Sequence, residues 1–338
     1  MPKGRERNRQ RAIARLARPK PWGDLPRGTH PCEGLLFIDK DQGVTSHDIV
    51  GALRRLGATR QVGHAGTLDP MATGLLIVAT GRLTKLIQYL VGADKTYEAR
   101  ICLGVGSNTD DAEGELHAGP PVHADDAAID AVLTNFIGDI MQVPATVSAI
   151  KVDGKRAHDR AREGEEVTLA ARPIHVERFA RTSPVHRRAI DGELAARVAE
   201  FDVVVTASSG TYVRALARDV GQDLGTEAHL TALRRTEIGP WNVTDAYSVA
   251  DLKGMIENDQ GLPVVSMAQV CRQVFPVIDI DDAEARALRN GLFIDKRAPI
   301  SAGTRADRWP AAAFCGYEAV ALVSPRSGKL KPDLQLTL

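Results

Sequence analysis

The pattern of apolar and polar positions predicts helices and strands that alternate along much of the chain. Short apolar runs bounded by turn residues are typical of strands, and apolar residues spaced three and four apart are typical of helices. The strand pattern occurs at 35–38, 75–79, 96–103 and 197–207, and the helix pattern at 45–56, 82–91, 126–137 and 211–224. In the first helix, Ile49, Leu53 and Leu56 share one face, and Thr45 or Ser46 is the expected N-cap.

The two ends of the chain differ from this central region. Residues 1–31 are basic and rich in proline, so we expect them to form a tail that is disordered when free. After Pro263 a new pattern begins, with an apolar run at 275–280, a helix at 283–291, and strands at 319–323 and 334–338. These patterns predict three parts: the tail 1–31, a main domain 32–270, and a small β-rich module 271–338.

Composition excludes several classes of protein. No apolar run approaches the roughly 20 residues of a membrane span, and no signal-peptide apolar region is present. The four cysteines are scattered without metal-ligand spacing, which favours reduced, buried thiols in a cytoplasmic protein. Neither a P-loop nor a strand-linked GxGxxG fingerprint occurs. The acidic run 110–115 fails the EF-hand spacing, so we expect 104–125 to be a long, solvated loop.

The most distinctive segment is GHAGTLDPMATG at residues 63–74. Its glycines permit positive φ, and Pro70 restricts Asp69 to extended or turn geometry. The apolar run that follows predicts a buried strand, so Asp69 would lie at the rim of a rigid sheet, where loops present reactive groups. An isolated Asp-Pro pair is typical of an ordinary turn. The whole segment is far more specific, and we interpret Asp69 as the essential catalytic residue.

This segment resembles motif II of the TruB family of pseudouridine synthases, which isomerise the T-loop uridine of tRNA. Further segments resemble motifs of that family, in the same order. They are KTYEA at 95–99, SAIKVDGK at 148–155, SGTYVRALARDVG at 209–221 and LRRT at 233–236. Together the motifs cover roughly residues 33 to 270.

The resemblance implies an α+β fold, the pseudouridine synthase fold, with a mixed, mainly antiparallel sheet flanked by helices. It also implies that residues of about 142–172 form an insertion that grips RNA, although their composition alone favours a charged surface helix. Residues 271–338 would form an RNA-binding module of the PUA type.

The expected reaction breaks the N1–C1′ bond of uridine, rotates the uracil, joins C5 to C1′ and removes the C5 proton. It needs no redox step or group donor, so no cofactor or metal is expected. Asp69 could attack C1′ as a nucleophile or take the C2′ proton, and the sequence does not separate these routes. A single carboxylate differs from the pair used by ordinary glycosidases and favours isomerisation, although a distant segment could supply a second acid.

The resemblance assigns roles to seven further residues. Arg214 is expected to make a bidentate contact with Asp69 and keep it ionised. Tyr97 would stack on the extruded uracil with its hydroxyl near the C5 proton, and Tyr212 would pack the site. His64 would fill the space left by the flipped base or contact the displaced nucleotide, and Lys85 and Lys151 would contact phosphate or order the site. Leu233 would form an apolar wall of the uracil pocket.

Each assignment has a plainer alternative. An arginine is most often a surface residue, while an aromatic residue in a β-run and a leucine such as Leu233 are often ordinary core residues. Lys40 and Gly43 match the first motif of the family, which we interpret as structural.

The implied partner is the T-arm of tRNA, bound by a monomer in the cytoplasm without a membrane or an obligatory protein partner. The alternatives are a guide-RNA-dependent synthase of the archaeal or eukaryotic type, a non-catalytic RNA-binding or RNA-folding protein, and a nucleoside or glycoside hydrolase.

The tail remains open to several interpretations. Residues 1–31 carry nine Lys or Arg against Glu6 and Asp24, which leaves a net charge of −7 on the rest of a chain whose total is zero. The tail could contact RNA phosphates, be merely solvated, or be an organellar presequence, although it lacks the usual serines.

Overall fold

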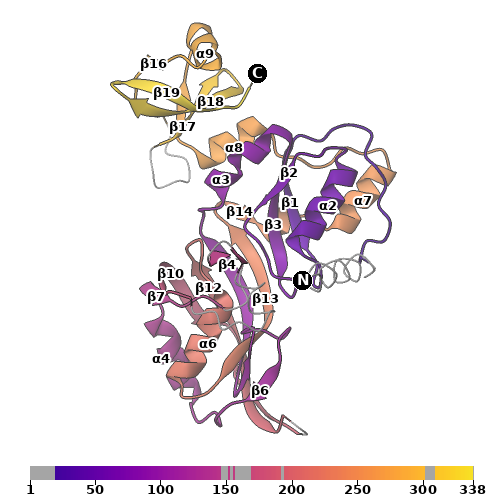
Figure 1. The fold of residues 1–338 in the computed structure, drawn as a ribbon, viewed down its shortest axis with the longest axis vertical. Coiled ribbons are helices and arrows are strands. Elements are labelled where there is room, and N and C mark those ends of the chain that lie inside the picture. The colour runs from indigo at the N-terminus through magenta and orange to yellow at the C-terminus, as the bar shows by residue number, and fades with distance from the viewer. Residues whose placement is uncertain are drawn as a thin grey trace, which may run out of the picture.

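The computed structural model describes residues 20–145, 169–191, 194–300 and 309–337, and the backbone of residues 151–152 and 155–156. A large sheet carries most of the chain, and a smaller sheet forms a separate layer at one end of the elongated molecule (Figure 1).

Among the described residues the large sheet has ten strands. Its main path is β1 (Gly34–Lys40), β3 (Thr73–Thr80), β13 (Ala228–Ile238), β4 (Lys95–Leu103), β12 (Ala196–Ala207), β10 (Arg172–Arg181) and β7 (Gly138–Gln142). Off this path, β2 (Val62–Ala65) pairs with β3, β11 (His186–Ile190) with β12, and β14 (Trp241–Asn242) with β13. The pairing of β3 with β13 is parallel and the others are antiparallel. The sheet is therefore mixed and mainly antiparallel, which confirms the expected fold class.

Strand β3 is buried on both faces of this sheet. Leu76 and Val78 belong to the apolar cluster on one face. Leu75 and Ile77 belong to the cluster on the other face. Side chains along a strand alternate between faces, so a continuous apolar run is what a strand covered on both sides requires. The sequence predicted this buried strand, and it gives the loop before β3 a rigid support.

Four helices contribute to the first of these clusters. They are α2 (Ser46–Leu56), α4 (Asp126–Asn135), α6 (Val213–Asp223) and α7 (Val249–Glu257). Helix α2 begins at a capping box, in which the Thr45 hydroxyl accepts the Asp48 N–H and the Asp48 carboxylate accepts the Thr45 N–H. Of the two predicted N-caps, Thr45 and Ser46, the structure shows that Thr45 is the N-cap.

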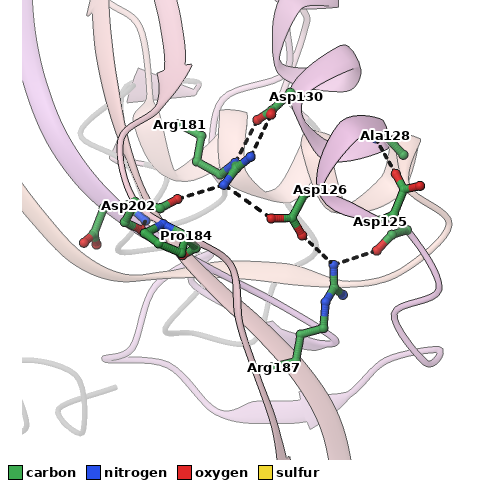
Figure 2. Close-up of polar contacts among 10 residues, drawn as sticks. Asp125, Asp126, Ala128, Asp130, Arg181, Pro184, Arg187 and Asp202 are labelled. Carbon is green, nitrogen blue, oxygen red and sulfur yellow. Dashed lines mark hydrogen bonds and ion pairs between the residues drawn. The ribbon is translucent and has the colours of Figure 1, made fainter.

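Ion pairs fasten α4 to the neighbouring strands (Figure 2). The Arg181 guanidinium on β10 makes two hydrogen bonds to Asp130, of 2.8 and 2.7 Å. Arg187 on β11 donates to Asp126 at 3.2 Å. These pairs lie on a partly exposed surface, so we expect them to orient the helix more than to stabilise it.

Residues 20–32 form an N-terminal strap that crosses α2. Trp22 is buried in the main core. The strap is hydrogen bonded along the helix, with the Gly28 N–H donating to Arg55 and the Cys32 N–H to Gly57. A Cβ on Gly28 would lie 2.0 Å from the Leu56 carbonyl oxygen, so only glycine permits this close approach. Because Trp22 inserts into the core, residues 20–31 do not follow the expectation of a disordered tail.

Two further segments differ from their predicted form. Residues 104–125 were expected to be a solvated loop, but they contain a hairpin of β5 (Val105–Ser107) and β6 (Leu116–Ala118). The predicted helix 82–91 is a 3₁₀ turn, η1 (Gly81–Leu86), followed by the short helix α3 (Ile87–Leu90). Another small hairpin pairs β8 (Lys151–Val152) with β9 (Lys155–Arg156).

The small sheet has five strands in the described residues. Their order is β15 (Val277–Asp279), β17 (Ala311–Cys315), β18 (Glu318–Arg326), β19 (Lys329–Gln335) and β16 (Ile294–Asp295), with α9 (Asp282–Arg289) packed beside them. This sheet confirms the predicted C-terminal β-rich module. Helix α8 (Met267–Val274) and the turn η2 (Val243–Asp245) complete the described elements that join it to the large sheet.

The two sheets share one apolar cluster. Phe37 on β1 and Trp241 on β14 belong to the same cluster as Phe275, Phe314 and Leu322. The C-terminal module therefore packs, through α8, against the face of the large sheet that carries Phe37 (Figure 1).

Cys102 and Cys271 are buried free thiols, as expected, whereas Cys32 and Cys315 are only partly buried. Across the part of the chain that the structure describes, we find no helix with the length and apolar character of a membrane span.

Candidate active site

Asp69 lies in the loop that joins β2 to β3, here called the Asp69 loop (residues 66–72). Its side chain is 37% exposed, so its carboxylate can reach a ligand. Gly74, at the start of β3, has a φ of +97°, and a Cβ there would lie 2.2 Å from the Arg235 carbonyl oxygen. Glycine at this position lets β3 approach β13 closely enough to pair with it, as Gly74 and Arg235 do.

The Asp69 loop is fastened to β1 and α2. The Ser46 hydroxyl donates to the Leu68 carbonyl at 3.1 Å and accepts the Leu68 N–H at 2.9 Å. The Gly43 N–H donates to the Pro70 carbonyl at 2.8 Å. The Lys40 ammonium donates to the carbonyls of Val44 at 2.9 Å and Pro70 at 3.4 Å. These bonds fix the backbone on both sides of Asp69, in agreement with the structural role predicted for Lys40 and Gly43.

A buried arginine fastens the same loop to β13. Arg235 is 1% exposed, and its guanidinium donates to the carbonyls of Leu75 at 2.7 Å and Gly66 at 3.1 Å. Its neighbour Arg234 makes a bidentate pair with Asp39, at 2.9 and 2.7 Å. The sequence pointed to the LRRT segment without assigning a role to either arginine.

Arg214 lies at the start of α6 and is only 4% exposed. Its Nη2 is 3.0 Å from Asp69 Oδ2, and its Nη1 is 3.1 Å from Asp111 Oδ2. Nη1 also donates to the Thr109 carbonyl at 2.7 Å. Arg214 and Asp69 are thus in contact through Nη2 and Oδ2, whereas the bidentate geometry expected for them stays a prediction. The guanidinium is also shared between two carboxylates that lie on different segments.

Asp111 and Asp110 belong to the acidic run that was expected to be solvated, and that expectation is wrong for both. Asp111 is 2% exposed and Asp110 is 6% exposed. Asp111 accepts from the Thr109 hydroxyl at 2.6 Å and from the Glu113 N–H at 3.0 Å, while Asp110 pairs with Arg218 at 3.2 Å. Burial raises the pKa of Asp110, and Arg218 opposes that shift. These acids are buried because α6 supplies a cation to each of them.

Other charges surround the Asp69 loop. Burial, Asp111 and Asp69 raise the pKa of Glu113, and the Arg214 guanidinium opposes that shift. Lys40 is fully buried, and burial lowers its pKa to about 8 against the opposing effect of Asp41 and Asp69. Two acids from a distant segment thus lie near Asp69: Asp111 shares the Arg214 guanidinium with it, and Glu113 senses its charge.

Tyr97 and Leu233 come from adjacent strands, β4 and β13, and both are buried. In the strand register Leu233 faces Ala99, and Tyr97 faces Arg235. Both side chains belong to the apolar cluster that also contains Leu68 and Met71 of the Asp69 loop. The structure therefore buries both predicted residues, and core packing and a pocket wall are both compatible with that burial.

Tyr212 immediately precedes α6, and the buried amide of Gln142 holds its backbone. The Tyr212 N–H donates to Gln142 Oε1 at 2.9 Å, and Gln142 Nε2 donates to the Tyr212 carbonyl at 3.0 Å. This double contact positions the first turn of α6, which carries Arg214. No local signal in the sequence identified Gln142.

His64 lies on β2, and its Nδ1 is buried without a hydrogen-bond partner among the described residues. Burial and the Arg235 guanidinium lower the pKa of His64, which favours the neutral imidazole. Lys85 is exposed on η1, as a phosphate contact requires. Lys151 begins β8, but its side chain lies outside the described part of the structure.

The arrangement can present one partly exposed carboxylate, that of Asp69, to a ligand. We find no group of three or more His, Cys, Asp or Glu residues suited to a metal ion among the residues that the structure describes.

Comparison with known proteins identifies the family. Residues 54–213 match the N-terminal domain of TruB family pseudouridylate synthase, and residues 214–276 match the C-terminal domain of tRNA pseudouridylate synthase B. The tRNA pseudouridine synthase B of Corynebacterium aurimucosum is 49% identical over 80% of this chain and 87% of its own length. The protein of that name from an Arthrobacter species is 47% identical over 89% of this chain and 95% of its own.

Solved structures share the fold at lower identity. A structure titled as an H/ACA RNP bound to a substrate RNA matches with a TM-score of 0.62 and 21% identity, over 95% of this chain and 93% of that one. A Cbf5-Nop10-Gar1 complex matches with a TM-score of 0.62 and 23% identity, over 95% and 92%. On the sequence matches, with Asp69 and Arg214 paired as expected, the chain belongs to the TruB family of pseudouridine synthases.

Proposed function

We propose that this protein converts uridine 55 in the T loop of tRNA to pseudouridine. The single observation that carries the proposal is the contact of 3.0 Å between the buried Arg214 guanidinium and the partly exposed Asp69 carboxylate. The names of the relatives, tRNA pseudouridine synthase B, support tRNA as the substrate.

Asp69 supplies the reactive oxygen. A charge-assisted contact between the Arg214 guanidinium and one oxygen of this carboxylate restricts the orientation of the side chain. The backbone bonds to Leu68 and Pro70 hold the loop before the substrate arrives, so little of the binding free energy is needed for ordering.

Two routes use this same carboxylate. In one, an Asp69 oxygen bonds to C1′ as the N1–C1′ bond breaks, and it leaves again when C5 of the rotated uracil bonds to C1′. In the other, Asp69 removes the C2′ proton, the N1–C1′ bond breaks to form a glycal, and the proton returns as C5 attaches. Both end with loss of the C5 proton and uptake of a proton at N1, so both conserve the mass of the nucleotide.

Tyr97 and Leu233 are proposed to hold the extruded uracil. Tyr97 would stack on the base with its hydroxyl near C5, and Leu233 would form an apolar wall. Extruding a base costs a few kcal/mol, which the stacking in the pocket offsets. A neutral His64 in the space vacated by the base suits a polar, uncharged neighbour, and Tyr212 would pack beside the pocket.

The remaining contacts are proposed to be made with RNA shape and phosphate. Lys85 and Lys151 would contact phosphates, the insertion of about 142–172 would close over the T-arm, and the module 271–338 would bind a further part of the RNA. We propose that the enzyme acts as a monomer in the cytoplasm, without guide RNA or an obligatory protein partner.

The substitution Asp69→Asn tests the proposal. We expect it to abolish pseudouridine formation in a tRNA transcript while tRNA binding stays within a few-fold, because the amide keeps the shape and loses the charge. Asp191→Asn, an exposed residue after β11, is the matched control and should retain full activity. Carbodiimide mapping locates the product, and mass spectrometry separates isomerisation from hydrolysis, which would release uracil. Turnover by the purified Asp69→Asn enzyme, or release of uracil by the wild type, would refute the assignment.

A further inference from the structure

Helix α6, which carries Arg214, begins without a side-chain cap in the described structure. Helices α2, α4, α7, α8 and α9 each begin at a residue whose side chain accepts a backbone N–H of the first turn. At the start of α6 the Tyr212 side chain makes no such bond, and the buried Thr211 Oγ1 has no hydrogen-bond partner among the described residues. The start of this helix therefore depends on contacts from elsewhere in the chain.

Gln142, at the end of β7, supplies these contacts. It is 2% exposed, and its amide accepts the Tyr212 N–H at 2.9 Å and donates to the Tyr212 carbonyl at 3.0 Å. The same carbonyl accepts the Leu216 N–H at 3.1 Å, which is the first hydrogen bond within α6. A buried side chain, 70 positions away in the sequence, thus holds the backbone group from which the helix starts.

The end of β7 holds α6 on both sides of Arg214. The carbonyl of Val143, the residue after Gln142, accepts from Arg218 Nη2 at 2.8 Å. Tyr212 and Arg218 are therefore both tied to β7, and Arg214 lies between them in the helix. These contacts fix the first turns of α6 relative to the large sheet.

The guanidinium of Arg214 has little freedom to adjust if the helix moves. It is 4% exposed, and it contacts the carboxylates of Asp69 at 3.0 Å and Asp111 at 3.1 Å. It also donates to the Thr109 carbonyl at 2.7 Å. Hydrogen bonds weaken steeply when their geometry is distorted. A shift of the first turn of α6 would disturb these contacts, and a misplacement of about 1 Å can slow a reaction about 100-fold.

We propose that Gln142 is a positioning residue of the active site, which orients the Arg214 guanidinium toward Asp69 by holding both backbone polar groups of Tyr212. The inference rests on the proposed function, because pseudouridine formation is the reaction whose rate Gln142 affects. A side chain that only satisfied buried polar groups would lower the free energy of unfolding when removed, without a specific effect on this rate.

The substitution Gln142→Met tests the proposal, because Met has a similar length and removes both hydrogen bonds. The single-turnover rate at saturating tRNA transcript should fall at least about tenfold, because Arg214 is no longer held in place. The dissociation constant of the transcript should stay within about threefold, so the loss falls on kcat rather than KM. Ile140→Ala is the matched control. Ile140 is partly buried on the same face of β7, so this variant should lose stability in urea unfolding and keep its rate within about twofold.

Two further measurements separate positioning from general destabilisation. In an Arg214→Lys background, Gln142→Met should slow the reaction by no more than about twofold, because the residue that Gln142 positions has already been replaced. Amide hydrogen exchange of residues 212–216 should be faster in Gln142→Met than in Ile140→Ala, because the Tyr212 N–H has lost its acceptor. An equal slowing in the wild-type and Arg214→Lys backgrounds would overturn the proposal. So would a wild-type rate in the folded Gln142→Met protein.

A second variant covers the case in which Gln142→Met does not fold. Gln142→Asn keeps the amide but is one methylene shorter, so it cannot make both hydrogen bonds to Tyr212 at their present lengths. Its rate should fall at least about threefold, and an unchanged rate would also overturn the proposal.

The wild-type measurement keeps this test separate from that of the proposed function. If the intact enzyme forms no pseudouridine, the proposed function fails. If the intact enzyme is active and both Gln142 variants match it, only the positioning role is refuted.

Discussion

Loss of the Arg214 guanidinium should damage both stability and catalysis, and the structure allows the two effects to be separated. The Arg214 side chain is 4% exposed and contacts Asp69 and Asp111, whose side chains are 37% and 3% exposed. In Arg214→Met, Asp69 can be solvated, but Asp111 remains a buried anion without its cation. Removing one member of a buried pair costs about 3–5 kcal/mol, so we expect the free energy of unfolding to fall by that amount.

A second substitution should recover most of that loss. Asn at position 111 keeps the shape of the carboxylate and can still accept from the Thr109 hydroxyl and the Glu113 N–H, which lie at 2.6 and 3.0 Å from Asp111. The double variant Arg214→Met with Asp111→Asn should therefore be more stable than Arg214→Met by at least about 2 kcal/mol, because no buried charge is left unpaired. Pseudouridine formation should stay at the level of the single variant, because Asp69 still lacks its guanidinium.

Urea unfolding followed by tryptophan fluorescence gives the stabilities, and single-turnover pseudouridine formation gives the rates. The reasoning is wrong if Arg214→Met unfolds at the wild-type urea concentration. It is also wrong if the added Asp111→Asn substitution restores catalysis, since Arg214 would then act through Asp111 alone.

Two further predictions concern the support of the Asp69 loop. Gly74→Ala should cost at least about 2 kcal/mol and slow catalysis, because it adds a positive-φ strain and a clash with the Arg235 carbonyl. Gly138→Ala is its control in urea unfolding, with a φ of +103° and no atom within 4 Å of the new Cβ, and an equal loss in both variants would contradict the clash. For Lys40, burial lowers the folded-state pKa to about 8, below that of the unfolded chain. The unfolded chain then binds more protons between about pH 8 and 10.5, so the contribution of Lys40 to stability rises with pH in that window. Between about pH 8 and 10.5, the free energy of unfolding of the wild type relative to Lys40→Met should increase by up to about 3 kcal/mol. A difference that does not change with pH would show that folding does not lower the pKa of Lys40.

The sequence predicted elements whose determinants lie within a few residues of one another. Helix α2 has its cap, its apolar face and its last turn within one short segment, and β3 is identified by an unbroken apolar run. The Asp69 loop was found in the same way, because its glycines and proline are adjacent in the chain.

Burial that depends on distant partners could not be predicted. Asp110 and Arg218 are 108 positions apart, so an acidic run that looks solvated in the sequence is buried by a helix encoded much later. The same holds for Trp22, which is buried against elements that include α7, and for Arg235, whose guanidinium reaches carbonyls on both sides of the Asp69 loop. In each case the burial depends on a tertiary contact, which the spacing of apolar residues along the sequence does not reveal.

The apolar cluster shared by the two sheets limits which fragments of this enzyme can be studied in isolation. Phe275 and Trp241 are covered in part by Phe314 and Leu322 from the far end of the chain. A fragment that ends before the small sheet would expose this apolar surface to water, and the fragment would tend to self-associate. The RNA binding proposed for the C-terminal module is therefore best tested by substituting its exposed side chains in the full-length protein.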